Sequence, residues 1–419
     1  MPEVRLLNGF HLYSSFLSGY RSLEAERAKI NRINVFPVPD GDTGSNLVAT
    51  VGAIVQSVRS TRSLSRTFRH VADSAISGAR GNSGMILAQF LGGLHRETGD
   101  RPHLSTGEFA AAVGNAVRSA YEAIENPVEG TMITVLRLWS EELHKLSRAT
   151  ADFRQLVLQG NKAAREALKN TRNQLKALKD AGVVDAGAMG LVAFLEGIGA
   201  SIRTGSVPRR PRADADAGWF DDEARTEDIP VSEDIPFRYC TEVLLAGRNH
   251  DAAALKTELH RFGDSLIVGT GAEKSRIHIH TNEPEDLLSL LRTKGGVLNQ
   301  KVDDMKRQYQ AAHDRISDTA IVTDSIADIP PDLMERYQIH VVPQRILWEG
   351  EVYLDRLTMT GKTFYPLLDV RKEYPTSSLP DPASVTAAFS FLAAHYKAIV
   401  ALPVSSGVSG TWQAMVKAA

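Results

Sequence analysis

The residues best suited to chemistry lie in one short stretch near the N-terminus, whose sequence is NVFPVPDGDTGSN over residues 34–46. Its two prolines cannot continue a preceding helix, so the chain must turn there. Asp40 and Asp42 flank one glycine, which lets both carboxylates converge on a single hard cation. An ordinary turn also favours Asp and Gly. The additional oxygen ligands of Asn34, Thr43 and Asn46 favour a metal site over that alternative.

The same stretch has features of a phosphate site. Gly44 lets the backbone approach a phosphate, and Ser45 or Asn46 can begin a helix whose first free N–H groups attract an anion. Three further turns of small residues, at 78–84, 127–132 and 182–187, stand at or before expected helix starts. Each could receive phosphate oxygens or could be only a tight connection between helices.

Length and composition exclude several classes of protein. A chain of 419 residues predicts two or three domains, and a formal charge of -2 provides no electrostatic footprint for nucleic acid. No apolar run of membrane-spanning length and no signal peptide are evident, so we expect a cytoplasmic protein without a transmembrane segment. The single cysteine, Cys240, excludes an intrachain disulfide and fits a reducing compartment.

Residues 6–204 have helical periodicity throughout. A seam of Leu6, Phe10, Tyr13, Leu17 and Tyr20 marks the first helix. Further helices are predicted at about 45–59, 65–77, 83–97, 107–124, 130–147, 151–178 and 186–203. The predicted fold is an all-α helical bundle or barrel over residues 1–204, followed by a polar linker over 205–236.

Residues 237–316 predict an α+β domain. Strands at 239–246, 265–269, 276–281 and 297–302, with helices at 251–262 and 284–293, follow the βαββαβ order of a ferredoxin-like module. Strand alternation places His278 and His280 on one face, and Cys240 on the neighbouring first strand. These three side chains could bind Zn²⁺ with an open fourth position. Alternatively, they only pack on a polar face that a second copy of the chain covers.

Residues 318–419 predict a parallel α/β domain, from strands at 320–322, 340–343 and 398–403 and helices near 360–369 and 383–396. The chain stops inside an expected helix that begins at Ser409. We therefore expect this third domain to be incomplete.

The acidic stretch at 34–46 and the three turns of small residues together resemble the nucleotide-binding domain of the dihydroxyacetone kinase L-subunit (DhaL) type. The resemblance is to the version found in bacterial fatty acid kinases. The resemblance covers about residues 5–205. It implies that Asp40 and Asp42 hold Mg²⁺ on the phosphates of ATP, with Asn34 as a further ligand. The residues that the resemblance places around the nucleotide are Gly44, Ser45, Asn46, Gly81, Asn82, Ser83, Gly84, Thr131, Met132, Asp185 and Gly187.

The later segments resemble other parts of the same system. The YCTE sequence at 239–242 and IHIHTN at 277–282 resemble a fatty acid kinase middle domain. The sequences TDSIAD at 323–328, PTSS at 375–378 and SSGVSGT at 405–411 resemble a DegV-type fatty-acid-binding domain. By that resemblance, the carboxylate of a fatty acid is bound by Thr376, Ser377, Ser405 and Ser406.

The function that these features predict is ATP-dependent phosphorylation of a fatty acid carboxylate to an acyl phosphate. With a pKa near about 4.3, a carboxylate is already ionised and needs no general base. Thr43 could bind phosphate and Arg80 could stabilise the transferring phosphoryl group. We expect a homodimer and downstream acyltransferases that use the acyl phosphate. The alternatives are a kinase for a small hydroxylated substrate such as dihydroxyacetone, and a catalytically silent lipid-binding regulator.

Overall fold

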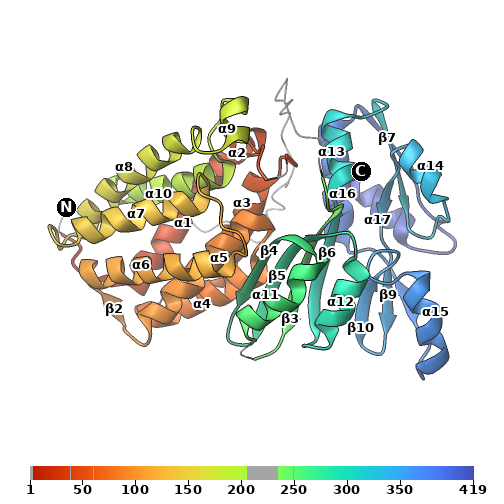
Figure 1. The fold of residues 1–419 in the computed structure, drawn as a ribbon, viewed down its shortest axis with the longest axis horizontal. Coiled ribbons are helices and arrows are strands. Elements are labelled where there is room, and N and C mark those ends of the chain that lie inside the picture. The colour runs from red at the N-terminus through yellow and green to blue at the C-terminus, as the bar shows by residue number, and fades with distance from the viewer. Residues whose placement is uncertain (1–2, 38, 60, 205–234, 249) are drawn as a thin grey trace. The chain divides into compact units, whose positions relative to one another are not determined.

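The computed structural model describes the whole chain except residues 1–2, 38, 60, 205–234 and 249 (Figure 1). The predicted linker over 205–236 therefore lies almost entirely outside the described residues. Two compact units are present, and we describe each by itself. The first contains the residues up to 204 together with Glu242–Ile279, and the second contains residues 235–241 and 280–419.

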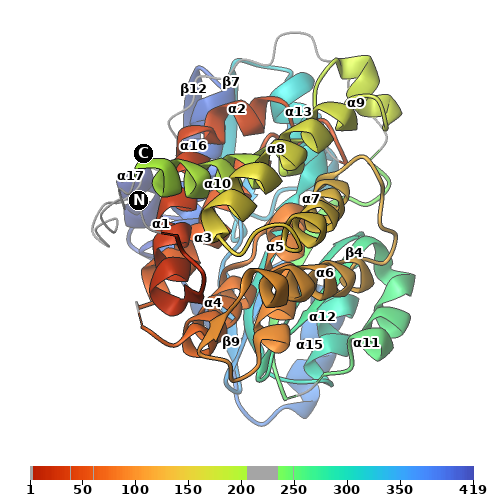
Figure 2. The ribbon, with the colours of Figure 1, turned by 90° about the vertical axis from the view of Figure 1, so that its left-hand side faces the viewer.

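The first unit is dominated by a bundle of α-helices that encloses one hydrophobic core. Helix α10 packs between α1 and α8, as the view of the bundle in Figure 2 shows. The bundle helices are α1 (Gly9–Ala25), α2 (Arg27–Arg32), α3 (Thr43–Ser57), α4 (Leu64–Gly78), α5 (Gly81–Thr98), α6 (Thr106–Ala123), α7 (Met132–Leu146), α8 (Phe153–Thr171), α9 (Lys176–Ala181) and α10 (Ala186–Thr204). The prediction of an all-helical N-terminal domain is confirmed.

Helix α10 is long and apolar enough to cross a membrane by length and composition, which was not expected from the sequence. Of the window that meets this test, 61% is buried within the protein. Its small residues explain the close packing, because a Cβ atom at Gly197 would lie 2.4 Å from the carbonyl oxygen of Ser18 on α1. Helix α10 is therefore a core helix of the bundle.

Three details of the bundle differ from the sequence predictions. The single helix predicted over 151–178 is two helices, α8 and α9, because the chain turns between Thr171 and Lys176. Helix α2 was not predicted. Two short strands, β1 (Leu7–Asn8) and β2 (His103–Leu104), pair antiparallel and join the start of α1 to the start of α6.

The middle module has the predicted βαββαβ order. Its elements are β3 (Tyr239–Ala246), α11 (Ala252–Leu259) with a 3₁₀ turn (His260–Phe262), β4 (Gly263–Thr270), β5 (Lys274–Thr281), α12 (Pro284–Arg292), β6 (Val297–Asp304) and the closing helix α13 (Met305–His313). The sheet order is β4-β5-β3-β6, so the first and third strands of the module are neighbours. This order is the ferredoxin-like arrangement that the sequence predicted.

Within the first unit, strand β4 of this sheet packs on helices α5 and α6 of the bundle. The side chains of Leu244 and Ile267 belong to the core cluster of the bundle. The backbone N–H of Glu125, after α6, donates to the carbonyl oxygen of Leu266 at 3.2 Å. The expectation of a dimer was based on an open sheet face. In this unit, part of that face is covered by the bundle of the same chain.

The second unit contains the α/β domain. Strands β12 (Ala398–Leu402), β7 (Thr319–Asp324) and β8 (His340–Val342) form the predicted parallel sheet in that order. Its helices are α14 (Pro331–Arg336), α15 (Gly361–Val370), α16 (Pro382–His395) and α17 (Thr411–Ala418). A second, antiparallel sheet with the order β10-β9-β11 was not predicted; it contains β9 (Arg345–Trp348), β10 (Glu351–Leu354) and β11 (Thr376–Ser378).

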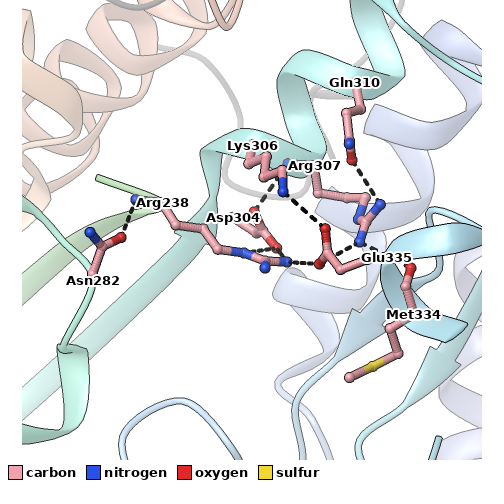
Figure 3. Close-up of polar contacts among 8 residues, drawn as sticks. All are labelled: Arg238, Asn282, Asp304, Lys306, Arg307, Gln310, Met334 and Glu335. Carbon is pink, nitrogen blue, oxygen red and sulfur yellow. Dashed lines mark hydrogen bonds and ion pairs between the residues drawn. The ribbon is translucent and has the colours of Figure 1, made fainter. Parts of the chain in front are cut away.

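An ion network joins the end of the middle module to this domain within the second unit (Figure 3). Nη2 of Arg238 lies 2.5 Å from Asp304 and 2.8 Å from Glu335 of α14. Arg307 of α13 also reaches Glu335, at 3.0 Å, and donates to the carbonyl oxygen of Met334 at 3.1 Å. Two arginines therefore converge on Glu335, which neutralises charge at this junction.

Candidate functional site

The acidic turn before α3 is held together by its own side chains. Nδ2 of Asn34 donates to Oδ1 of Asp40 at 2.5 Å, and Oγ1 of Thr43 donates to Oδ1 of Asn34 at 2.6 Å. Asn34 is buried and 5% exposed. Asn34 therefore lies with the two aspartates, as predicted, and links Asp40 to the first residue of α3.

Asp42 occupies the N-cap position of α3, but its side chain makes no capping hydrogen bond. Its carboxyl group faces that of Asp40 instead. Burial and the charge of the Asp42 carboxylate raise the pKa of Asp40 well above its ordinary value. Two carboxylates forced together in this way are relieved by a divalent cation, and oxygen donors are the ligands that Mg²⁺ prefers. The residues of the turn fit a magnesium ion.

The predicted phosphate turn at residues 78–84 lies directly beside this acidic turn. Ser45 is fixed by Asn31, whose Oδ1 accepts the Ser45 N–H at 3.1 Å. Gly81 has a φ of +58°, and a Cβ atom there would lie 2.5 Å from Nδ2 of Asn46. The start of α5 is thus packed against the start of α3. Arg80, the residue before α5, is exposed, and its N–H donates to Oγ1 of Thr50 at 3.1 Å.

The remaining turns, at 127–132 and 182–187, lie beside the turn at 78–84. A Cβ atom at Gly187 would lie 2.5 Å from Oγ of Ser83 and 3.4 Å from Cβ of Met132. The buried carboxyl group of Asp185 accepts hydrogen bonds from the backbone N–H groups of Ala188 and Met132. Burial raises the pKa of Asp185 to about 6, and those two hydrogen bonds act in the opposite direction.

The N-termini of α3, α5, α7 and α10 therefore converge, although 143 residues separate the first from the last (186 − 43). Helix N-termini present unsatisfied N–H groups and a partial positive charge, so such a cluster suits an anion. Oδ1 of Asn82 is buried and accepts no hydrogen bond from the described residues. Thr131 is the N-cap residue of α7, and its Oγ1 donates to the Val128 carbonyl oxygen at 2.8 Å.

In the middle sheet, the three predicted metal ligands lie together. The ligand atoms of Cys240, His278 and His280 are all within 4.8 Å of one another, and both histidines are buried. The prediction that they share one face of neighbouring strands is confirmed. Their identity as a zinc site stays a prediction.

The predicted carboxylate-binding residues of the α/β domain are exposed. Thr376 and Ser377 lie on β11, whereas Ser405 and Ser406 lie in the turn after β12. In the described part of the chain, no hydrogen bond joins the first pair to the second. Asp324, at the end of β7, fixes the start of the second segment, because its Oδ2 accepts the Val404 N–H at 2.7 Å.

Several residues that support the site were not predicted from the sequence. Asn31 and Thr50 lie outside the motifs but hold motif residues by hydrogen bonds. Glu242 and Arg276 form a buried ion pair beside the start of α5. The sequence carried one signal for this pair: Glu242 and Arg276 are charged residues within apolar strands, and such residues are rarely buried without a partner.

Family models match the three parts of the chain in order. A DAK2 domain matches residues 37–200, a FakA-like fatty acid kinase middle domain matches 236–312, and the DegV family matches 318–419. The chain is therefore built from a DAK2 domain, a FakA-like middle domain and a DegV-family segment.

Individual curated relatives are similar to most of this chain. The protein YloV of Bacillus subtilis is 32% identical over 316 residues, which cover 73% of this chain and 57% of the relative. An uncharacterised protein of Staphylococcus epidermidis is 30% identical over 349 residues, which cover 78% of this chain and 62% of the relative. This chain thus spans about three fifths of the length of these curated relatives.

Two solved structures are similar to separate parts. DegV of Bacillus subtilis, described as a fatty acid binding protein, is 34% identical over 24% of this chain and 36% of its own, with a TM-score of 0.23. The dihydroxyacetone kinase of C. freundii, solved with AMP-PNP and Mg²⁺, is 19% identical over 45% of this chain and 33% of its own, with a TM-score of 0.36.

Proposed function

We propose that this protein transfers the γ-phosphoryl group of ATP to the carboxylate of a fatty acid, forming an acyl phosphate. The observation that carries the proposal is the convergence of four helix N-termini beside two facing carboxyl groups. The order of the DAK2, fatty acid kinase-like and DegV parts supports a fatty acid as the acceptor.

Each part of the site has a role in this reaction. Asp40 and Asp42 would hold Mg²⁺, which when bound neutralises charge on the phosphates. Thr43, Gly44, Ser45 and Asn46 bind phosphate oxygens from the start of α3. Residues Gly81, Asn82, Ser83, Gly84, Thr131, Met132, Asp185 and Gly187 surround the rest of the nucleotide. Asn34 acts mainly by orienting Asp40, because both ends of its amide are already hydrogen-bonded to the turn.

The reaction requires positioning more than acid–base chemistry. One carboxylate oxygen of the substrate forms a bond to the γ-phosphorus while the bond to the bridging oxygen breaks, and ADP leaves with that electron pair. No proton is transferred, so this acceptor does not require a general base from the acidic turn. Arg80 is exposed at the start of α5, where its guanidinium can approach the transferring group.

The DegV-family segment would supply the acyl substrate. Thr376, Ser377, Ser405 and Ser406 are its candidate carboxylate ligands. Tethering raises the effective concentration of a poorly soluble substrate. We also propose that Cys240, His278 and His280 bind Zn²⁺. The zinc content of the wild type and of Cys240→Ser tests this site, and equal, negligible zinc in both would contradict it. A cytoplasmic location, homodimerisation and downstream acyltransferases remain expectations.

The decisive experiment supplies the protein with MgATP and either oleate or dihydroxyacetone, and measures ADP together with acyl phosphate trapped as hydroxamate. Hydroxamate formation with oleate supports the proposal. ADP release with dihydroxyacetone alone would identify a small-hydroxyl kinase, and oleate binding without any turnover would identify a lipid-binding regulator.

Asp42→Asn should lower turnover at least about 100-fold, the scale on which removal of one electrostatic contact to a transition state acts. The matched control is Asp180→Asn, which changes an exposed aspartate of α9 and should leave turnover within about 2-fold. Equal activities of these two variants would overturn the metal assignment.

A further inference from the structure

A buried ion pair lies against the nucleotide-site residues in the first unit. The side chains of Glu242 on β3 and Arg276 on β5 are 3% and 6% exposed, and Nη2 of Arg276 lies 2.7 Å from Oε2 of Glu242. The desolvation of two ions offsets most of their attraction, so a buried pair of this kind contributes little stability of its own. Stability alone therefore does not explain why this ion pair lies beside the nucleotide-site residues.

The other oxygen of the same carboxylate contacts the helical bundle. Oε1 of Glu242 accepts the backbone N–H of Gly81 at 2.6 Å. Gly81 is the first residue of α5, where a helix leaves its N–H groups without partners. Its positive φ and the nearby Asn46 exclude a side chain at this position. A side chain of the middle sheet therefore fixes the first N–H of the phosphate turn.

Glu242 also lies next to the predicted metal ligands. Nδ1 of His278 is 3.5 Å from Oε1 of Glu242, the oxygen that receives the Gly81 N–H. Arg276 and His278 are two residues apart on β5, so they share the sheet face that Glu242 also occupies. One carboxylate thus contacts the phosphate turn, a buried cation and a histidine of the Cys240 cluster.

We propose that Glu242 is a positioning residue for the nucleotide phosphates. Paired with Arg276, it holds Gly81 in place, so that the next N–H groups of α5, those of Asn82 and Ser83, keep a fixed direction towards a phosphate. The middle domain thereby completes the nucleotide site of the DAK2 domain. This inference rests on the proposed nucleotide site but not on the identity of the acceptor.

The test is the affinity of the full chain for MgATP, measured by calorimetry. Glu242→Gln should weaken MgATP binding about 10-fold, since it removes the charge that orders the turn. Glu125→Gln is the matched control, because Glu125 also joins the bundle to the middle module, through His260 at 2.5 Å. Among the described residues, its carboxylate makes no hydrogen bond or ion pair with α5. The MgATP affinity of this control should stay within about 2-fold of the wild type.

A second variant separates positioning from folding. Glu242→Gln alone leaves the Arg276 guanidinium buried without its partner, so the protein should also unfold at a lower temperature. Adding Arg276→Gln should restore the unfolding temperature but not the MgATP affinity. Recovery of both would overturn the inference, as would unchanged affinity in Glu242→Gln. Intact MgATP binding without acyl phosphate formation would overturn only the proposed function, whereas a wild type that does not bind MgATP would overturn both.

Discussion

The two candidate binding regions differ in how firmly the protein holds their side chains. In the helical bundle, Asn34 and Asp185 are 5% and 4% exposed, and each makes hydrogen bonds that fix its orientation. In the α/β domain, Thr376 and Ser405 are exposed. Ordering a free side chain on binding costs conformational entropy, so the bundle is already organised for a ligand and the α/β segment is not.

The largest effect should come from truncating a buried side chain of the bundle rather than an exposed one of the α/β domain. Phe68 of α4 is fully buried, and Phe68→Ala should lower the free energy of unfolding by about 3–5 kcal/mol. Val400 of β12 is 46% exposed, and Val400→Ala should change the free energy of unfolding by at most about 0.5 kcal/mol. Calorimetric unfolding of both variants measures the contrast. Similar losses would mean that side-chain burial does not set the cost of truncation at these two positions.

Asp185 should make the stability of the bundle depend on pH. Its pKa is raised by burial to about 6, so the native state holds a proton that the unfolded state releases near its ordinary value of 3.8. Stability conferred by the protonated form is therefore lost as the pH rises from about 4 to about 6, by up to about 3 kcal/mol. Unfolding free energies of the wild type and Asp185→Asn, compared across this range, measure the effect.

The stability of Asp185→Asn relative to the wild type should rise over the same pH range, because asparagine does not ionise. Asp100→Asn, which changes an exposed aspartate after α5, is the control for loss of a surface charge. If the two variants gave the same pH profile, the raised pKa of Asp185 would be wrong.

The smallest effect on the fold should come from the α/β motif. We expect Thr376→Ala to weaken oleate binding about 10-fold, the loss of one hydrogen bond to a charged group, while unfolding and MgATP affinity stay unchanged. Thr386→Ala, an exposed threonine of α16, is the matched control. Oleate affinity that is equal in both variants would remove Thr376 from the binding site.

Periodicity and turn chemistry predicted most of the elements, but they could not place every boundary. No Gly or Pro separates α8 from α9, and the intervening turn is decided by packing: a Cβ atom at Gly130 would lie 2.8 Å from Cβ of Gln174. The hairpin of β9 and β10 did carry a signal, since Glu349 and Gly350 both have positive φ, which two-residue hairpin turns require. An X-Gly pair between two apolar runs could have identified it.

The sequence by itself determined the acidic turn, the small-residue turns and the alternation that places Cys240 near His278 and His280, because these depend on residue type and local geometry. Tertiary structure alone decided that four helix starts spread over the chain meet at one place, and that Glu242 reaches Gly81 across 161 positions. Contacts between distant segments depend on how complementary surfaces pack, and no local pattern records which surfaces meet.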